Sequence, residues 1–201
     1  MGWERYFWRH GYGTVTNERF PTMALSDKHR LPSEVIRKRR EAIGLDHATV
    51  AAAMGINKSS YYDLEDFETE IWTCVEIIKV CRLCRFLKLT PDEVFEGSES
   101  SSGVAPHQGK YPVGGLASLR LLIADELART GESVSKFEDR VGWELQGFLA
   151  GTESGLNWNM DGLADICQGC GADWLAVLQN EFDSGNWERQ GGKGNNREGH
   201  L

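Results

Sequence analysis

Two pairs of cysteines have the C-x-x-C spacing found in zinc sites: Cys81 with Cys84, and Cys167 with Cys170. Four thiolates at such spacing can hold Zn²⁺ tetrahedrally. Each pair lies in a segment of helical periodicity, however, where cysteine behaves as a small apolar residue, and neither pair has the flanking glycines of a zinc knuckle on both sides. We expect no metal site and no cofactor. Because five cysteines in a chain without an export signal favour reduced thiols, we also expect no disulfide.

Catalytic motifs are equally hard to find. The sequence has no G-x-S-x-G motif, no glycine-rich phosphate loop and only five scattered histidines. We therefore predict that the protein is not an enzyme.

Phosphate binding needs basic side chains, and the chain has one basic cluster, which runs from Arg37 to Arg40. A solvated helix face explains such a cluster equally well. The net charge of −8 opposes binding to a polyanion, and the charge is uneven: +2 over residues 1–31, −3 over 32–97 and −7 over 98–201. The acidity therefore lies mostly in the second half.

The spacing of apolar residues predicts an all-α protein with five short helices between residues 32 and 95, the fourth of them within 71–87. Suitable caps and stops flank these helices. The expected caps are Ser33, Asp46, Asn57 and Thr90, and the expected stops are Gly44 and Gly55. The expected core positions include Val35, Ile36, Ile43, Val50, Ala51, Met54, Tyr61 and Leu64, whereas Lys58, Ser59, Tyr62 and Asp63 should point outward.

Two helices of about eight residues joined by a glycine-containing turn are what a reader of the DNA major groove requires. The stretch IRKRREAIGLDHATVAAAMGINKSSYYDLED, residues 36–66, resembles the lambda repressor and Cro (XRE) family of helix-turn-helix domains. CRFLKLTPDEVF, residues 84–95, resembles that family's closing helix pair. The resemblance covers about 65 residues and implies that the third helix enters the major groove.

The resemblance implies DNA-binding roles for individual residues of the chain. His47 stands where the family usually has a glutamine that touches phosphate, Lys58 could bond guanine, and Ser59 and Ser60 could meet bases or phosphates. The full set of expected DNA-binding residues is Arg37, Lys38, Arg40, His47, Asn57, Lys58, Ser59, Ser60, Tyr62 and Asp63. In some members of the family, the residues matching Arg40 and Glu65 form a pair that positions the helices. Asp63 and the departure at His47 weaken the electrostatic case for tight binding.

The second half looks like a degenerate copy of the first. The spacing from Gly44 to Gly55 recurs from Gly131 to Gly142, but the third helix is about three residues shorter and has no basic residue. We therefore expect it to serve dimerisation or partner binding. Its aromatics, Trp143, Phe148, Trp158 and Trp174, are candidates for an apolar contact surface, although aromatics at helical spacing more often belong to the core.

Composition divides the chain into five parts. These are an N-terminal arm (1–31), a helix-turn-helix domain (32–96), a flexible linker rich in Gly and Ser (97–115), the degenerate domain (116–182) and a disordered tail (183–201). Together with the family resemblance, this division predicts an all-α fold of two small, lambda-repressor-like five-helix domains in tandem. Met23 is an alternative start to Met1. No apolar run could cross a membrane, so we expect a cytoplasmic protein.

Two functions remain open. The first is a prokaryotic or phage transcriptional regulator that binds double-stranded DNA as a homodimer. The alternative is a protein-interaction module, such as an antitoxin or immunity partner, that keeps the helix-turn-helix architecture but has lost the charge for DNA, with residues 116–182 as a possible contact for a protein partner.

Overall fold

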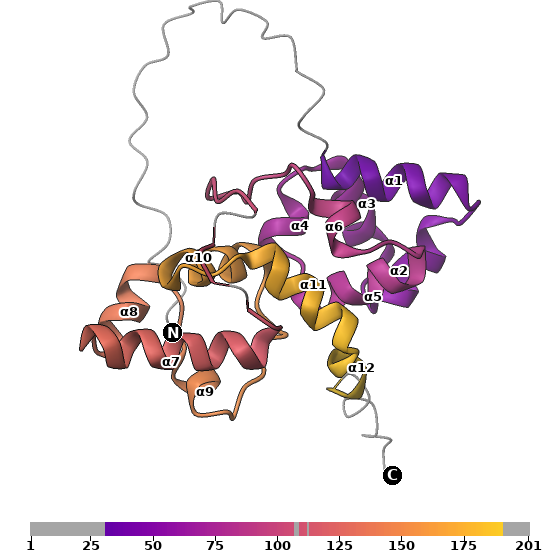
Figure 1. Cartoon of the computed structure of the whole chain (residues 1–201). Helices are drawn as coiled ribbons and strands as arrows, with labels where there is room; N and C mark the ends of the chain where they lie inside the picture. The colour runs from indigo at the N-terminus through magenta and orange to yellow at the C-terminus, as the bar shows by residue number, and fades with distance from the viewer. Residues whose placement is uncertain (1–30, 107–108, 112, 191–201) are drawn as a thin grey trace, which may run out of the picture.

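The computed structural model describes residues 31–106, 109–111 and 113–190, which form helices joined by turns and loops (Figure 1). Within these ranges, β-structure is limited to two isolated bridges, Glu76 with Asn159 and Tyr111 with Ala172. The all-α class predicted from the sequence is confirmed. The expected N-terminal arm lies outside the described residues, apart from Leu31.

Twelve helices occur in the described residues. The first half contains α1 (Pro32–Ala42), α2 (His47–Met54), α3 (Lys58–Asp66), α4 (Glu70–Thr73), α5 (Ile77–Leu87) and α6 (Pro91–Phe95). The second half contains α7 (Leu116–Thr130), α8 (Val134–Val141), α9 (Gln146–Leu149), α10 (Met160–Cys170), α11 (Trp174–Ser184) and α12 (Asn186–Gln190). The longest, α7, has 15 residues. No helix in the described part of the chain is long and apolar enough to span a bilayer.

Side-chain caps fix where the helices of the first half begin. The carboxylate of Asp46 accepts an N–H from the first turn of α2 at 2.7 Å, and the side chain of Asn57 does the same for α3 at 2.8 Å. Thr90 and Glu93 form a reciprocal capping box at the start of α6. These three predicted caps are confirmed, and each satisfies a backbone donor that the helix itself leaves unpaired.

Two expectations for α1 are wrong. Ser33 does not cap the helix, because Pro32 takes the first helical position, where its missing N–H costs nothing, and Ser33 is buried in the first turn. Ile43 lies just beyond the last residue of α1 and is 38% exposed, since the helix ends before this position can face the core.

The apolar segment 71–87 is divided into two helices rather than one. The N–H groups of Ile77 and Ile78, which open α5, donate to the backbone carbonyls of Trp158 and Leu156 at 2.8 and 3.0 Å. The loop before α10 therefore caps α5 from a distance in sequence. Local periodicity carries no information about such a partner, which explains why the break was not predicted.

The two halves share one hydrophobic core. Trp72 of α4, Phe95 of α6 and Trp174 of α11 form a cluster of edge-to-face rings, with centroids 5.2, 5.4 and 5.8 Å apart. In Figure 1, α10 and α11 lie directly against α4 and α6. Independent domains joined by a flexible linker are therefore not what the structure shows, because the aromatic contacts cross between the halves.

The segment predicted as the linker is also packed wherever it is described. Ser98, Ser100 and Val104 are buried, and Val104 accepts a hydrogen bond from the indole N–H of Trp174 at 3.3 Å. The backbone N–H of Ser101 donates to the carboxylate of Asp161 at 3.0 Å. The polar composition of the segment did not predict this packing, because its polar groups find partners: the buried hydroxyl of Ser100 accepts the N–H of Val104 at 2.9 Å, and the exposed Ser101 and Ser102 bond to carboxylates of α10.

The four aromatic residues of the second half that were candidates for a contact surface lie in or against the core. Phe148 and Trp174 are 0% and 1% exposed, Trp158 is 8% exposed, and Trp143 is partly buried with its indole N–H 3.4 Å from Asp165. This burial confirms the interpretation that their helical spacing favoured.

The chain also stays ordered beyond residue 182, where a disordered tail was expected. Helix α11 continues to Ser184, and α12 follows after Gly185. Trp187 is 4% exposed, and Glu188 lies 2.9 Å from Arg85 of α5. The buried ring of Trp187 anchors this polar segment, which explains why its composition wrongly predicted disorder. Residues 191–201 lie outside the described part of the chain.

Candidate nucleic-acid interface

A three-residue turn joins α2 to α3. Gly55 ends α2 with φ of 76°, a left-handed conformation that lets its N–H and that of Ile56 close back onto the carbonyls of Ala52 and Ala51. Asn57 then begins α3. Its side-chain oxygen accepts from the backbone of Ser60 and from the hydroxyl of Ser59 at 2.8 and 2.6 Å. Because that oxygen is occupied, Asn57 positions α3 in this structure.

The sequence predicted both faces of α3 correctly. Tyr61 and Leu64 are completely buried against the core of the first half. The four residues expected to point outward, and Ser60 as well, are exposed; they are Lys58, Ser59, Tyr62 and Asp63. The amino-terminal part of α3 therefore presents a polar surface on a helix that is anchored from behind.

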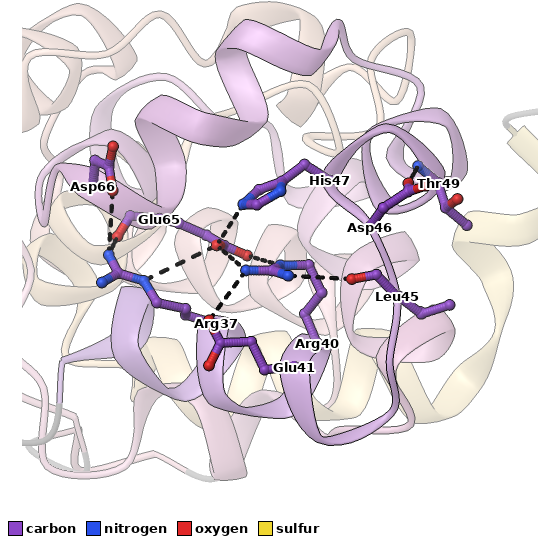
Figure 2. A network of polar contacts seen from close by, with 9 residues as sticks. All are labelled: Arg37, Arg40, Glu41, Leu45, Asp46, His47, Thr49, Glu65 and Asp66. Carbon is purple, nitrogen blue, oxygen red and sulfur yellow. Dashed lines mark hydrogen bonds and ion pairs between the residues drawn. The ribbon is translucent and has the colours of Figure 1, made fainter.

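A buried ion pair ties α3 to α1, as Figure 2 shows. The guanidinium of Arg40 holds the carboxylate of Glu65 through two hydrogen bonds of 2.7 and 2.8 Å, and it also donates to the carbonyl of Leu45 at 3.1 Å. Arg40 and Glu65 are 7% and 3% exposed. A planar bidentate pair of this kind fixes both distance and orientation between the two helices.

Electrostatics at this pair follow from its burial and its partners. Burial alone would raise the pKa of Glu65, but the hydrogen bond and positive charge of Arg40 outweigh it, so the pKa lies below its ordinary value. The same hydrogen bond raises the pKa of Arg40. Both groups therefore stay charged at neutral pH, and the pair remains intact.

The burial of Arg40 corrects its assignment as a DNA-binding residue, since its guanidinium is fully used inside the protein. Arg37 donates to the backbone carbonyl of Glu65 and lies 3.4 Å from Asp66, although its side chain is 42% exposed. Lys38 is exposed and lies 3.3 Å from Glu34. The basic cluster is therefore largely paired with acidic residues, which reduces what it can offer to phosphate.

His47, at the start of α2, braces α3. Its ring stacks on Tyr62, with centroids 4.1 Å apart and planes 27° apart, and its Nε2 lies 3.2 Å from the carboxylate of Glu65. The ammonium of Lys58 lies 5.3 Å from the centre of the Tyr62 ring. The sequence did not reveal this Lys58–Tyr62–His47 stack; the only signal for it was the four-residue spacing between Lys58 and Tyr62.

Acidic groups border the exposed face of α3. Ser60 and Asp63 line a pocket of about 470 Å³ beside the turn, together with Glu70, Cys74 and Lys79. Of these charged groups, two are acidic and one is basic. A nucleic-acid backbone would therefore approach the Lys58 end of α3 more easily than the Asp63 end.

The four paired cysteines lie inside the core rather than at this surface. Cys81 and Cys84 belong to α5, and Cys167 and Cys170 belong to α10. Burial raises the pKa of all four thiols, to about 12 for Cys81 and about 11 for Cys170. They pack as small apolar side chains among the core residues. Among the described residues, no group of three or more potential ligands could hold a metal ion.

Comparison with models of known protein families, with curated proteins and with solved structures found no match.

Proposed function

We propose that this chain is a sequence-specific, DNA-binding transcriptional regulator of the prokaryotic or phage repressor type, with α3 set into the major groove. The observation that supports this most directly is the exposed amino-terminal face of α3, held from behind by the buried Arg40–Glu65 pair. An α-helix fits the major groove, and rigid support keeps its side chains in register with the base edges.

The exposed side chains divide into two roles. Lys58 carries the positive charge closest to the start of α3 and suits the acceptors of guanine or a phosphate. Tyr62 is held between His47 and Lys58, so its position on the surface is defined before any DNA arrives. Ser59 and Ser60 supply hydroxyl groups at the same end. Arg37 and Lys38, whose side chains are 42% and 68% exposed, remain the predicted residues of α1 that can give phosphate contacts.

Such a regulator would act as a homodimer in the cytoplasm, where two copies of α3 enter successive major grooves about one helical turn apart. The second half, whose α9 has only four residues, would supply the contact between the two subunits.

Selection from random-sequence duplexes, read by sequencing, tests the proposal without assuming any operator sequence. We expect an enriched motif with two inverted half-sites. On that motif, Lys58→Ala and Ser59→Ala should each weaken binding by roughly five- to a hundredfold, as expected for contacts to bases. Lys136→Ala and Ser135→Ala, exposed positions on α8, are matched controls and should leave affinity unchanged. The absence of any enriched motif would contradict the proposal.

A second candidate is a protein-interaction module such as an antitoxin or immunity partner. The net charge of −8 and the exposed Asp63 and Asp66 on α3 favour it. Capture of partners from the native host, followed by a salt titration, separates the two functions. Affinity for DNA falls with a log–log slope of about −0.9 per phosphate neutralised, whereas an apolar protein interface is far less sensitive to salt.

A further inference from the structure

A second pocket lies away from α3, in the second half. It measures about 780 Å³ and is lined by the start of α7, the loop 151–158, and residues of α11 and α12. Its size is in the range of pockets that hold small organic ligands. The lining is mixed: Leu116, Leu156 and Trp158 are apolar, whereas Asn157 and Asn186 offer hydrogen bonds.

A buried carboxylate forms one side of this pocket. Glu181 of α11 is 6% exposed, and one of its oxygens accepts the N–H of Leu116 at 3.0 Å. Among the described residues, no Lys, Arg or His side chain forms an ion pair with it. Burying a carboxylate without a countercharge is expensive, so Glu181 favours the arrival of a cation.

Two guanidinium groups line the same pocket. Arg120 of α7 is held over the ring of Phe148 at 4.7 Å and donates one hydrogen bond, of 3.0 Å, to the carbonyl of Glu153. Arg189 of α12 is exposed. Neither forms an ion pair with another described side chain, and their planar donors suit a carboxylate. The other acidic lining residue, Glu153, is exposed and therefore better solvated than Glu181.

Opposite charges thus face one pocket without pairing with each other. A single charged group on a ligand would satisfy only one of them. We propose that this pocket binds a small zwitterion, an amino acid or a short peptide, whose ammonium group pairs with Glu181 and whose carboxylate pairs with Arg120 and Arg189. The apolar part of the ligand then lies against Leu156 and Trp158.

Ligand binding at this pocket should raise the stability of the whole chain. Loop 151–158 supplies the carbonyls that cap α5, and α11 contributes Trp174 to the shared core. A ligand that bridges α7, this loop and α11 therefore stabilises both halves together. This binding is independent of whether α3 contacts DNA, so it can be measured on the chain alone.

Thermal unfolding of the full chain, with each free proteinogenic amino acid and with alanine-containing dipeptides, tests the proposal. At least one ligand should raise the Tm in a saturable manner, by about 3 °C or more at ten times its Kd. The two arms distinguish a free amino acid from a peptide. The N-acetyl and the amide derivatives of the active ligand, which each lack one charge, should each bind roughly tenfold more weakly. No shift with any ligand, or equal shifts with the two derivatives and the parent ligand, would overturn the proposal.

Three variants locate the binding. Ala117→Phe fills the pocket from an exposed position on α7 and should abolish the shift, while Ala124→Phe, exposed on the same helix but outside the pocket, should leave it intact. Arg189→Ala alters an exposed side chain, so the fold should persist while affinity falls roughly five- to tenfold. A full ligand shift in Ala117→Phe would show that the ligand binds elsewhere.

Discussion

The α2–α3 unit and the α8–α9 unit begin alike and end differently. Asp46 and Ser133 cap the first helix of each unit, and Gly55 and Gly142 end it with φ of 76° and 77°. After that point, α3 has nine residues and an exposed polar face. Helix α9 has four residues, and the carboxylate of Glu138 on α8 binds the N–H groups at its start, at 2.6 and 3.1 Å. One local design therefore leads either to a nine-residue helix with an exposed polar face or to a four-residue helix.

The residues equivalent to the Arg40–Glu65 pair that holds α3 are different in the unit that contains α9. Counted back from Gly44 and Gly131, the place of Arg40 is taken by Leu127. Counted back from the ends of α3 and α9, the place of Glu65 is taken by Phe148. Both of these apolar residues pack in or against the core. Apolar contacts can therefore hold such a helix, and the buried ion pair adds a fixed orientation rather than the packing itself.

Trp174→Ala should have the largest effect, because it removes the ring that the second half contributes to the cluster joining the halves. We expect a loss of about 4 kcal/mol in the free energy of unfolding, as for a large buried aromatic. Urea unfolding should remain one transition, seen equally by tryptophan fluorescence and by circular dichroism, since the core is shared. Leu121→Ala, 67% exposed on α7, is the control and should change stability by less than about 0.5 kcal/mol. Two separate transitions would mean that the halves fold independently.

Glu65→Ala should follow, with a loss of about 3 kcal/mol, because it leaves the guanidinium of Arg40 buried without its partner. The double variant Arg40→Leu/Glu65→Leu makes this anchor apolar, as in the second half, and should recover most of that loss. The double-mutant cycle built from Arg40→Leu, Glu65→Leu and this double variant, measured by urea unfolding, gives the coupling energy of the pair. Glu68→Ala, at an exposed position, is the control. Additive losses in the cycle would show that the pair contributes no coupling.

Low pH should reduce the free energy of unfolding through the carboxylate of Glu65. The pKa of Glu65 is lower in the folded protein than its ordinary value of 4.5, so its contribution to stability is complete above that pH. The contribution is lost as the pH falls from 4.5 through the lower folded-state pKa. Urea unfolding of the Glu65→Gln variant should therefore show a weaker pH dependence between pH 5 and pH 3, roughly, than the native chain. Identical pH profiles would exclude Glu65 as a source of acid sensitivity.

Local signals in the sequence predicted the local structure of the candidate site. The caps Asp46 and Asn57, the turn at Gly55 and the buried Tyr61 and Leu64 all depend on neighbours within a few residues, and all are confirmed. The pairing of Arg40 with Glu65, which the family resemblance implied, is present as well. That the exposed residues of α3 contact DNA stays a prediction, because the structure describes the protein chain alone.

Local signals in the sequence did not predict the contacts between the two halves. The carbonyls of Leu156 and Trp158 break the apolar segment before Ile77, and Asp161 and Trp174 pack against the serine-rich segment that composition assigned to a linker. Each of these partners is more than fifty residues away in the chain. Periodicity and composition describe a segment alone, so they cannot register a partner that only the tertiary fold supplies.

Substitution of Gly55 and Gly142, the left-handed glycines that end α2 and α8, should have the smallest effect on stability. Alanine disfavours φ near 76°, so Gly55→Ala and Gly142→Ala should each cost about 1 kcal/mol in unfolding free energy. Space is not the limiting factor: an added methyl group at Gly142 meets nothing within 4 Å, and at Gly55 it lies 3.2 Å from the mobile end of Arg82.

Their effects on DNA binding should nevertheless differ, because only Gly55 leads into a helix with an exposed polar face, α3, and sets its direction. Affinity for the selected motif should fall in Gly55→Ala and stay unchanged in Gly142→Ala, at matched stability and fixed salt. Equal losses of affinity in both variants would mean that α9 takes part in recognition as much as α3 does. The functional asymmetry between the halves would then have to be abandoned, even though their structures differ.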